Sequence, residues 1–166
     1  QTHAVARVPF YDFASADTII SFDADFLGTW IAPVWFSRQY AQGRKLTAEH
    51  PTLSYHVQVE TQLSLAGAGS DERLPVLPSE QRGTVFALAT SIAKATGFSG
   101  AVPAGKTPYT KQVADWTKRL LDAKGKSLVV SGSDDVAVQT AINLINQQLG
   151  NYGKTVDVDR GMLGYD

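Results

Sequence analysis

The residues from Lys126 to Asp157 place the strongest constraint on how this chain can fold. The stretch opens with the apolar, β-branched run Ser127–Val130, which is typical of a strand buried on both faces of a parallel sheet. A Gly-Ser-Asp turn follows, and then an apolar stripe of helical spacing that Gly150 ends, formed by Val138, Ala141, Ile142, Ile145 and Leu149. A strand, a turn and a helix in this order make half of a nucleotide-binding α/β unit.

The turn in this unit carries the wrong charge for a phosphate site. A Gly-Ser turn at a helix N-terminus attracts anions, but here Asp134 and Asp135 stand at the helix start and complement the helix dipole themselves. The sequence contains neither G-x-G-x-x-G nor G-x-x-x-x-G-K-[ST]. We therefore favour a capping role for this turn, with Ser133 as the N-cap.

Strand and helix patterns alternate along the rest of the chain. The expected strands are Ala4–Phe10, Thr18–Phe22, Tyr55–Glu60 and Lys154–Val158, with an extended piece at Leu74–Pro78. The expected helices are Pro33–Gln42, Gln81–Ala95 and a third that Thr110 caps and Gly125 ends, whereas Leu63–Asp71 reads as an ordered loop. This alternation predicts an α/β fold with a mostly parallel, doubly wound, Rossmann-like sheet and helices on both faces.

The chain divides into two halves at a segment rich in Gly and Pro. Residues 1–97 form the expected first α/β half, 98–109 the connection and 110–166 the second half, together one compact domain. At 166 residues the chain is long enough for a single core. It begins at Gln1 and its one methionine is Met162, so we expect a piece excised from a larger subunit.

The overall composition excludes several classes of function. The formal net charge is -1, which gives no general attraction to nucleic acid. No apolar run is long enough to span a bilayer, so we expect no direct membrane insertion. The chain has no cysteine, which removes thiolate metal sites, iron–sulfur ligation and cysteine nucleophiles from this piece.

Three loops follow the expected strands and are the candidate binding sites, since open α/β sheets bind ligands beyond the carboxyl ends of their strands. The first holds Asp23 and Asp25, which could bind a metal or ribose hydroxyls, or serve as turn residues; we favour the turn role. The second is Thr61–Asp71, and Glu60 at the end of the strand before it is an acid that could bind ribose or simply end a strand. The third provides Ser131, Gly132 and Ser133.

Other possible sites are weaker. His3, His50 and His56 stand far apart in the sequence, and no H-E-x-x-H or G-x-S-x-G motif is present, so we expect no metal site and assign no catalytic residue. Four aromatic residues follow the first buried strand and could stack on a base, although packing in the core or against a partner is the favoured role: Phe26, Trp30, Trp35 and Phe36.

Several segments resemble one family. In chain order they are Tyr11–Phe13, Ala16–Trp30, Ser37–Tyr40, Val59–Glu60, Leu65–Ala68, Asp71–Val76, Asn146 and Leu149–Val156. They are similar to the molybdopterin-oxidoreductase-like, iron–sulfur binding subunit of alternative complex III, a quinol:cytochrome c oxidoreductase. The similarity runs over nearly the whole chain in order, and it extends more distantly to the middle domains of formate dehydrogenase and dimethyl sulfoxide reductase relatives.

The resemblance implies a fragment of a respiratory electron-transfer complex on the outer, periplasmic face of the cytoplasmic membrane. The implied partners are the rest of the parent polypeptide, the membrane quinol-binding subunits and the cytochrome c subunits. Iron–sulfur clusters belong elsewhere in the parent. In molybdenum-containing relatives, the loops matched by Asp23–Gly28, Glu60–Gln62 and Gly132–Asp135 line a molybdopterin guanine dinucleotide.

Three functions remain open from the sequence, of which the least specific is a free-standing nucleotide-binding module. The first is a structural and partner-contact domain that has lost the cofactor, with Asp23, Asp25, Glu60, Ser131, Gly132 and Ser133 as remnants of its site. The second is a domain that binds the guanosine end of molybdopterin guanine dinucleotide through these residues. The four carboxylates Asp23, Asp25, Asp134 and Asp135 favour the first, because they would repel a pyrophosphate.

Overall fold

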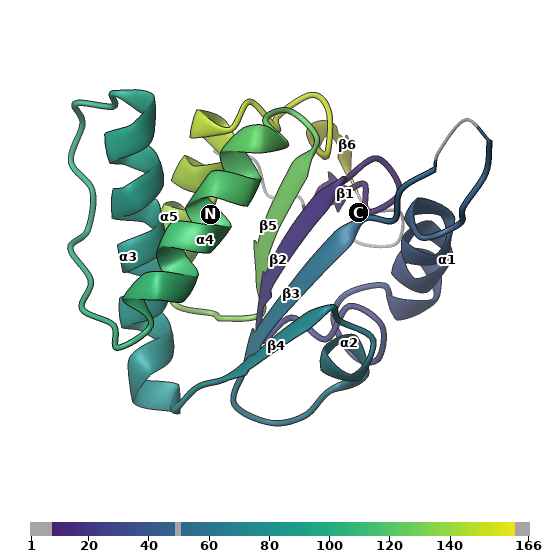
Figure 1. The fold of residues 1–166 in the computed structure, drawn as a ribbon, viewed down its shortest axis with the longest axis horizontal. Helices are drawn as coiled ribbons and strands as arrows, with labels where there is room; N and C mark the ends of the chain where they lie inside the picture. Colours follow the sequence, from purple (N-terminus) through teal and green to yellow (C-terminus); the bar gives the residue numbers. More distant parts are fainter. Residues whose placement is uncertain (1–7, 49–50, 162–166) are drawn as a thin grey trace.

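A computed structural model describes residues 8–48 and 51–161 of the chain. It is an α/β protein built on a parallel sheet of four strands in the order β4-β3-β2-β5 (Figure 1). The strands are β2 (Thr18–Phe22), β3 (Tyr55–Glu60), β4 (Glu72–Pro75) and β5 (Ser127–Ser131). The chain order reverses between β2 and β5, which lie side by side with Ile20 opposite Val129.

Helices connect these strands. They are α1 (Pro33–Gly43), α2 (Leu65–Ala68), α3 (Pro78–Thr96), α4 (Thr110–Asp122) and α5 (Val136–Gln148). Glycines end two of the long helices as predicted, because Gly97 and Gly150 adopt the left-handed conformation, with φ of 73° and 67°. Outside the main sheet, β1 (Pro9–Tyr11) pairs antiparallel with β6 (Val156–Gly161) in a separate two-stranded ribbon.

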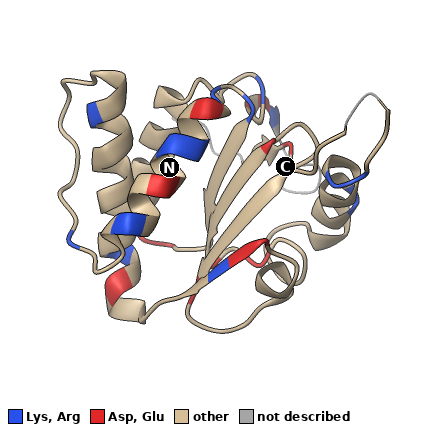
Figure 2. Cartoon of the chain, in the orientation of Figure 1, with Lys and Arg blue, Asp and Glu red and all other residues tan. Residues whose placement is uncertain are grey.

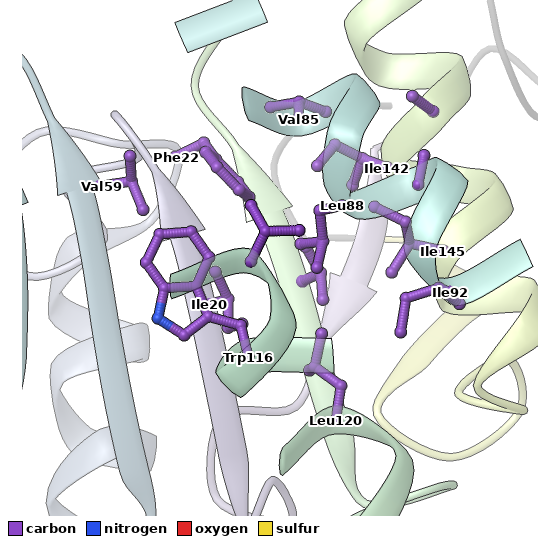
Figure 3. Close-up of a cluster of buried hydrophobic side chains, with 14 of the residues drawn as sticks. Ile20, Phe22, Val59, Val85, Leu88, Ile92, Trp116, Leu120, Ile142 and Ile145 are labelled. Carbon is purple, nitrogen blue, oxygen red and sulfur yellow. The ribbon is translucent and has the colours of Figure 1, made fainter. Parts of the chain in front are cut away.

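The larger hydrophobic cluster lies between the main sheet and helices α3, α4 and α5. Alternate sheet residues such as Ile20 and Val59 point into it, and Trp116 of α4 is completely buried there (Figure 3). The predicted apolar stripe of α5 is buried in this cluster at each of its five positions. Burial of this helix face therefore follows the helical period that the sequence displays.

A second hydrophobic cluster contains the strand residues that point to the opposite side of the main sheet. Ile19 of β2 and Leu128 of β5 contribute to it, together with Phe36 and Tyr40 of α1. Its aromatic residues are in mutual contact: the rings of Phe13 and Phe26 stack with their centroids 4.3 Å apart. Of the aromatic residues singled out in the sequence, Phe26 and Phe36 are fully buried, whereas Trp35 remains 42% exposed.

The outer edge of β5 is closed by side chains instead of another strand. Asn146 of α5 forms hydrogen bonds with both backbone groups of Val129. Thr155 donates to the carbonyl of Ser127, and Gln139 donates to the carbonyl of Ser131. These contacts satisfy polar backbone groups that an edge strand otherwise leaves unpaired.

Several sequence predictions need correction. The presumed loop Leu63–Asp71 contains helix α2, because Ser64 caps a short turn by accepting from the Gly67 N–H. Thr110 is the first residue of α4, and the N-cap position belongs to Tyr109. The terminal strand runs later than predicted, at Val156–Gly161. The predicted strand Ala4–Phe10 lies partly outside the described residues, as do His3 and His50.

Helix α3 begins at Pro78, three residues before the predicted start, because proline suits the first turn of a helix. The Gly/Pro-rich connection packs along this helix (Figure 1). The Thr107 hydroxyl lies 2.9 Å from that of Thr84, and no Cβ would fit at Gly83 because of the Lys106 carbonyl. Strands from both halves of the chain lie in one sheet.

Candidate functional site at the carboxyl edge of the sheet

The three candidate loops meet at one edge of the sheet, as their positions after parallel strands predict. Strands β3, β2 and β5 are neighbours, and their carboxyl ends lie at the lower edge in Figure 1. The reversal of strand order between β2 and β5 occurs here, at the type of position where open α/β sheets bind ligands. Geometry thus brings together Asp23, Asp25, Glu60, Ser131, Gly132 and Ser133.

Asp23 and Asp25 both join the first loop to the second. Asp23 has a positive φ of 50°, and its Oδ1 accepts a hydrogen bond of 2.9 Å from the Thr61 N–H. Oδ1 of Asp25 accepts from the Ala66 N–H at 3.0 Å. Both carboxylates therefore hold backbone N–H groups of the loop after β3, 38 and 41 residues further along the chain.

The third loop packs directly on the first. Gly132 donates its N–H to the Phe22 carbonyl at 2.9 Å, and a Cβ at this glycine would lie 2.5 Å from the Asp23 carbonyl oxygen. Real Cβ atoms do not approach backbone that closely. Gly132 is therefore required for contact between the two loops. The absence of a side chain at this position lets it lie against the Asp23 backbone, where a dinucleotide-binding glycine would lie against a pyrophosphate.

Glu60 is almost completely buried, with 1% of its surface exposed. Its carboxylate accepts from the Ser64 N–H at 3.3 Å, from the Ser64 hydroxyl at 2.6 Å and from Nε of Arg73 at 2.5 Å. A Cβ at Gly67 would overlap the same carboxylate. These contacts use the acceptor atoms that a ribose hydroxyl would need.

The start of α5 corrects the predicted cap. The N-cap is Asp135, whose Oδ1 accepts from the Ala137 N–H at 2.8 Å, and Ser133 supports it by accepting from the Asp135 N–H at 3.2 Å. The Ser131 hydroxyl in turn accepts from the Ser133 N–H at 3.2 Å. Asp135 also lies 3.2 Å from Arg82 of α3 in an exposed ion pair.

The same edge of the sheet exposes apolar side chains. We call four of them the apolar rim, because they follow the carboxyl ends of β3, β4 and β5: Leu63, Leu65, Leu77 and Val136, each 62–67% exposed. Exposed apolar side chains of this size are available for contact with another protein.

A buried polar network below the second loop escaped the sequence analysis. His56 is fully buried, and its Nδ1 lies 3.1 Å from the Tyr40 hydroxyl, which donates to the Gly69 carbonyl at 2.8 Å. Burial lowers the pKa of His56 to about 4. The sequence signal was alternation: His56, Gln58 and Glu60 all occupy one face of β3.

His56 is neutral at physiological pH, and so its ring carries one N–H. Tyr40 gives its hydroxyl proton to Gly69, so we place the ring N–H on Nδ1, where it donates to the Tyr40 oxygen. Nε2 is then an acceptor, and it is satisfied when the Gln58 amide turns its NH₂ towards the ring. This orientation also gives a partner to Gln58 Nε2, which otherwise lacks one.

The residues at this edge do not fit a dinucleotide as they stand. The acids that could hold ribose bind the chain's own N–H groups or Arg73, and Gly132 is closed against the Asp23 backbone. Asp135 occupies the cap position where a phosphate would meet the first N–H groups of α5. Hollows are present between α5 and the connection and around α1.

Charge on the main sheet is confined to its β3–β4 side: β2 and β5 carry no charged residue (Figure 2). Within residues 8–48 and 51–161, no group of three or more His, Asp or Glu side chains is placed to hold a metal ion. No helix in the same ranges is long and apolar enough to cross a membrane.

Compared with known proteins, the chain matches no family model, and no curated protein matches it.

Proposed function

We propose that this chain is a cofactor-free structural and partner-contact domain of a molybdopterin-oxidoreductase-type subunit, in a membrane-associated complex that oxidises quinol. The main support comes from the contacts that residues make at the carboxyl edge of the main sheet. The carboxylates of Asp23, Asp25, Glu60 and Asp135 are engaged in hydrogen bonds and ion pairs within the chain, while the apolar rim is exposed. Such an edge is suited to contact with protein and poorly suited to an anionic cofactor.

The proposal includes a doubly wound, Rossmann-like topology. One support is the strand order, which reverses between β2 and β5. The other is that the strand residues pointing to either side of the sheet each belong to a buried apolar cluster. In this proposal the partners are the rest of the parent polypeptide and the quinol-binding and cytochrome c subunits, on the periplasmic face of the membrane. That placement rests on the sequence resemblance.

One observation favours a second candidate function. The strand order places a switch point between β2 and β5, where relatives with this order bind nucleotides. On this reading the domain would hold the guanosine end of molybdopterin guanine dinucleotide after the loops around Gly132 rearrange.

A nucleotide titration separates the two candidates. GDP is added to the chain up to about 5 mM, well above ordinary nucleotide affinities, and amide chemical shifts are followed by NMR. We expect no saturable change. Saturable shifts at Asp23, Thr61 and Gly132 would overturn the cofactor-free proposal and favour the second candidate.

Assembly tests the partner-contact role. The parent polypeptide is produced with Leu63→Glu, Leu65→Glu and Leu77→Glu, and membranes are run on native gels stained for haem. We expect at least about a fivefold loss of co-migration with haem proteins, because a charge at the core of an interface is strongly unfavourable. Leu46→Glu and Leu53→Glu, exposed leucines away from the rim, are the controls. Normal assembly of the rim variant would refute the role of the rim, and a parent that never co-migrates with haem would refute the family placement.

A further inference from the structure

A second surface, separate from the apolar rim, combines unpaired arginines with an exposed tryptophan. It is a hollow of about 280 Å³ between α1 and the β1–β6 ribbon. Helix α1 presents Trp35, Arg38, Gln39 and Gln42 to it, at the i, i+3, i+4 and i+7 spacing that places residues on one helix face. Phe10 and Arg160 line the opposite wall.

The aromatic residues hold one arginine in place. The guanidinium of Arg160 lies 4.0 Å from the centre of the Phe10 ring, and Trp35 meets the same ring edge-on with centroids 6.5 Å apart. Stacking on an aromatic face fixes a guanidinium and leaves the N–H groups in its plane free to bind a carboxylate. Gln39, itself only 6% exposed, is held by accepting a hydrogen bond from the Phe13 N–H.

The charge of this hollow is unbalanced. Among the ion pairs of the described residues, none involves Arg38 or Arg160. The acid at the hollow is Asp12, and its carboxylate already accepts from the Ala14 N–H and from both the N–H and the hydroxyl of Ser15. Helix α1 carries one basic residue, Arg38, and no acidic residue (Figure 2). The hollow therefore carries two cations, Arg38 and Arg160, against the one carboxylate of Asp12, and this net charge of +1 favours an incoming anion.

An apolar hollow adjoins it and shares two of its residues. Ala32, Pro33 and Val34 line this space of about 360 Å³ together with Trp35 and Arg38. Val34 is 87% exposed. A free phosphate would use the arginines and leave this apolar surface bare, whereas a peptide with acidic and apolar side chains would cover both hollows.

We propose that these two hollows dock an acidic segment of a partner protein. Carboxylates bind Arg38 and Arg160, and an apolar side chain of the same segment packs beside Val34 and Trp35. Trp and Arg are the residue types that carry most binding energy at protein interfaces. The site shares no residue with the apolar rim, so failure of either proposal leaves the other standing.

The test uses a fluorescently labelled, capped peptide of sequence Glu-Leu-Glu-Leu-Glu-Leu and measures its anisotropy on titration with the chain. We expect saturable binding that weakens about tenfold or more in Arg38→Glu/Arg160→Glu and about threefold in Trp35→Ala, as losses of charge pairs and of an aromatic contact predict. Lys118→Glu, a single charge reversal on an exposed position of α4, should change the affinity less than about twofold.

Unfolding curves for each variant establish that it is folded before binding is compared. The matched peptide Gln-Leu-Gln-Leu-Gln-Leu should bind at least about tenfold more weakly. The proposal is overturned by equal binding of the two peptides, by equal loss in Lys118→Glu, or by no binding at about 1 mM chain. It is also overturned if inorganic phosphate or vesicles containing phosphatidylglycerol bind through these arginines and the acidic peptide does not.

Discussion

The side-chain amide of Asn146 pairs with both backbone groups of Val129 and takes the place of a neighbouring strand. Its Oδ1 accepts from the Val129 N–H at 3.1 Å, and its Nδ2 donates to the Val129 carbonyl at 2.7 Å. Asn151 supports the arrangement by donating to the same Oδ1 at 2.9 Å. Because β5 is an edge strand of the sheet, this contact satisfies groups that would otherwise be buried without partners.

Asn146→Ala should therefore lower the free energy of unfolding by about 2–3 kcal/mol, because it leaves a buried N–H and a buried carbonyl unpaired. Urea unfolding measures the change. Asn143→Ala on the same helix is the control, since the buried Nδ2 of Asn143 has no partner to lose, and it should cost less than about 0.5 kcal/mol. Equal losses in the two variants would show that the Val129 pairing contributes nothing special.

Glu60 and Arg73 form an ion pair of which the acid is buried and the base is 30% exposed. Removal of either partner leaves the other without its opposite charge, and Arg73→Ala leaves the carboxylate buried. We expect Arg73→Ala to cost about 3 kcal/mol in urea unfolding. Arg82→Ala breaks the exposed pair with Asp135 and should cost at most about 0.5 kcal/mol.

A double-mutant cycle isolates the pair. Glu60→Gln in the Arg73→Ala background should cost less than Glu60→Gln alone, with a coupling of about 1–3 kcal/mol, because the two side chains are in contact. Strict additivity would contradict a structural role for Glu60 and reopen its assignment to a ligand.

The order of the main-sheet strands and the long helices was predictable because most of these elements have a clear period and a clear end. The β-branched run of β5 and the five-residue stripe of α5 identify a strand and a helix, and Gly150 ends the helix as expected. That β2, β3 and β5 run parallel follows from the helices between them, and it is why the candidate loops meet.

Details that depend on partners far along the chain were not predictable. Ser133 and Asp135 are both good caps, and the backbone at Asp135 decides between them. Whether Glu60 binds a ligand or the chain depended on Arg73, thirteen residues later, and on a short helix too brief for a periodic signal. The closure of β5 by Asn146 depends on tertiary contact, and its polar position on the helix face gave no indication of its partner.

The corrected cap gives a direct test. Asp135→Ala should cost about 1 kcal/mol, because it removes the acceptor of the Ala137 N–H. Asp134→Ala at the exposed neighbouring position should cost less than about 0.5 kcal/mol. Thermal or urea unfolding of both variants measures the two losses of stability. A larger loss for Asp134→Ala than for Asp135→Ala would show that the charge of the turn, and not the cap hydrogen bond, stabilises the helix start.

Gly132 tests the contact between the first and third loops. Gly132→Ala should cost about 1–3 kcal/mol, because the new methyl group would lie against the Asp23 carbonyl and force the loops apart. Gly69→Ala offers a matched control: its nearest new contact would be an ordinary 3.5 Å, and its φ of -94° suits alanine. Calorimetry should show a lower melting temperature for the first variant and no loss for the second. If Gly132→Ala is tolerated, the space between the loops is larger than the structure indicates and a ligand could enter it.

The buried His56 makes stability depend on pH in a defined window. Its pKa is lowered from 6.5 to about 4 by burial, so between these values the unfolded chain binds a proton that the folded chain does not. The contribution of this group is therefore complete above about pH 6.5, falls as the pH drops through the window, and changes no further below about pH 4. At 1.36 kcal/mol per pKa unit the loss amounts to about 3 kcal/mol.

Urea unfolding at several pH values between 7 and 4 measures this loss, and His56→Gln is the comparison because it cannot titrate. The variant should be less stable near pH 7 but should lose about 3 kcal/mol less than the wild type across the window. Asp71 does not contribute to the loss of stability measured between pH 7 and 4. Its pKa is lowered first by the hydrogen bond from Arg44, so its contribution is present above the ordinary value of 3.8 and is lost only at lower pH. Parallel pH profiles for wild type and His56→Gln would show that His56 binds a proton as readily in the folded chain as in the unfolded chain, and the assignment of Nε2 as an acceptor from Gln58 would then be wrong.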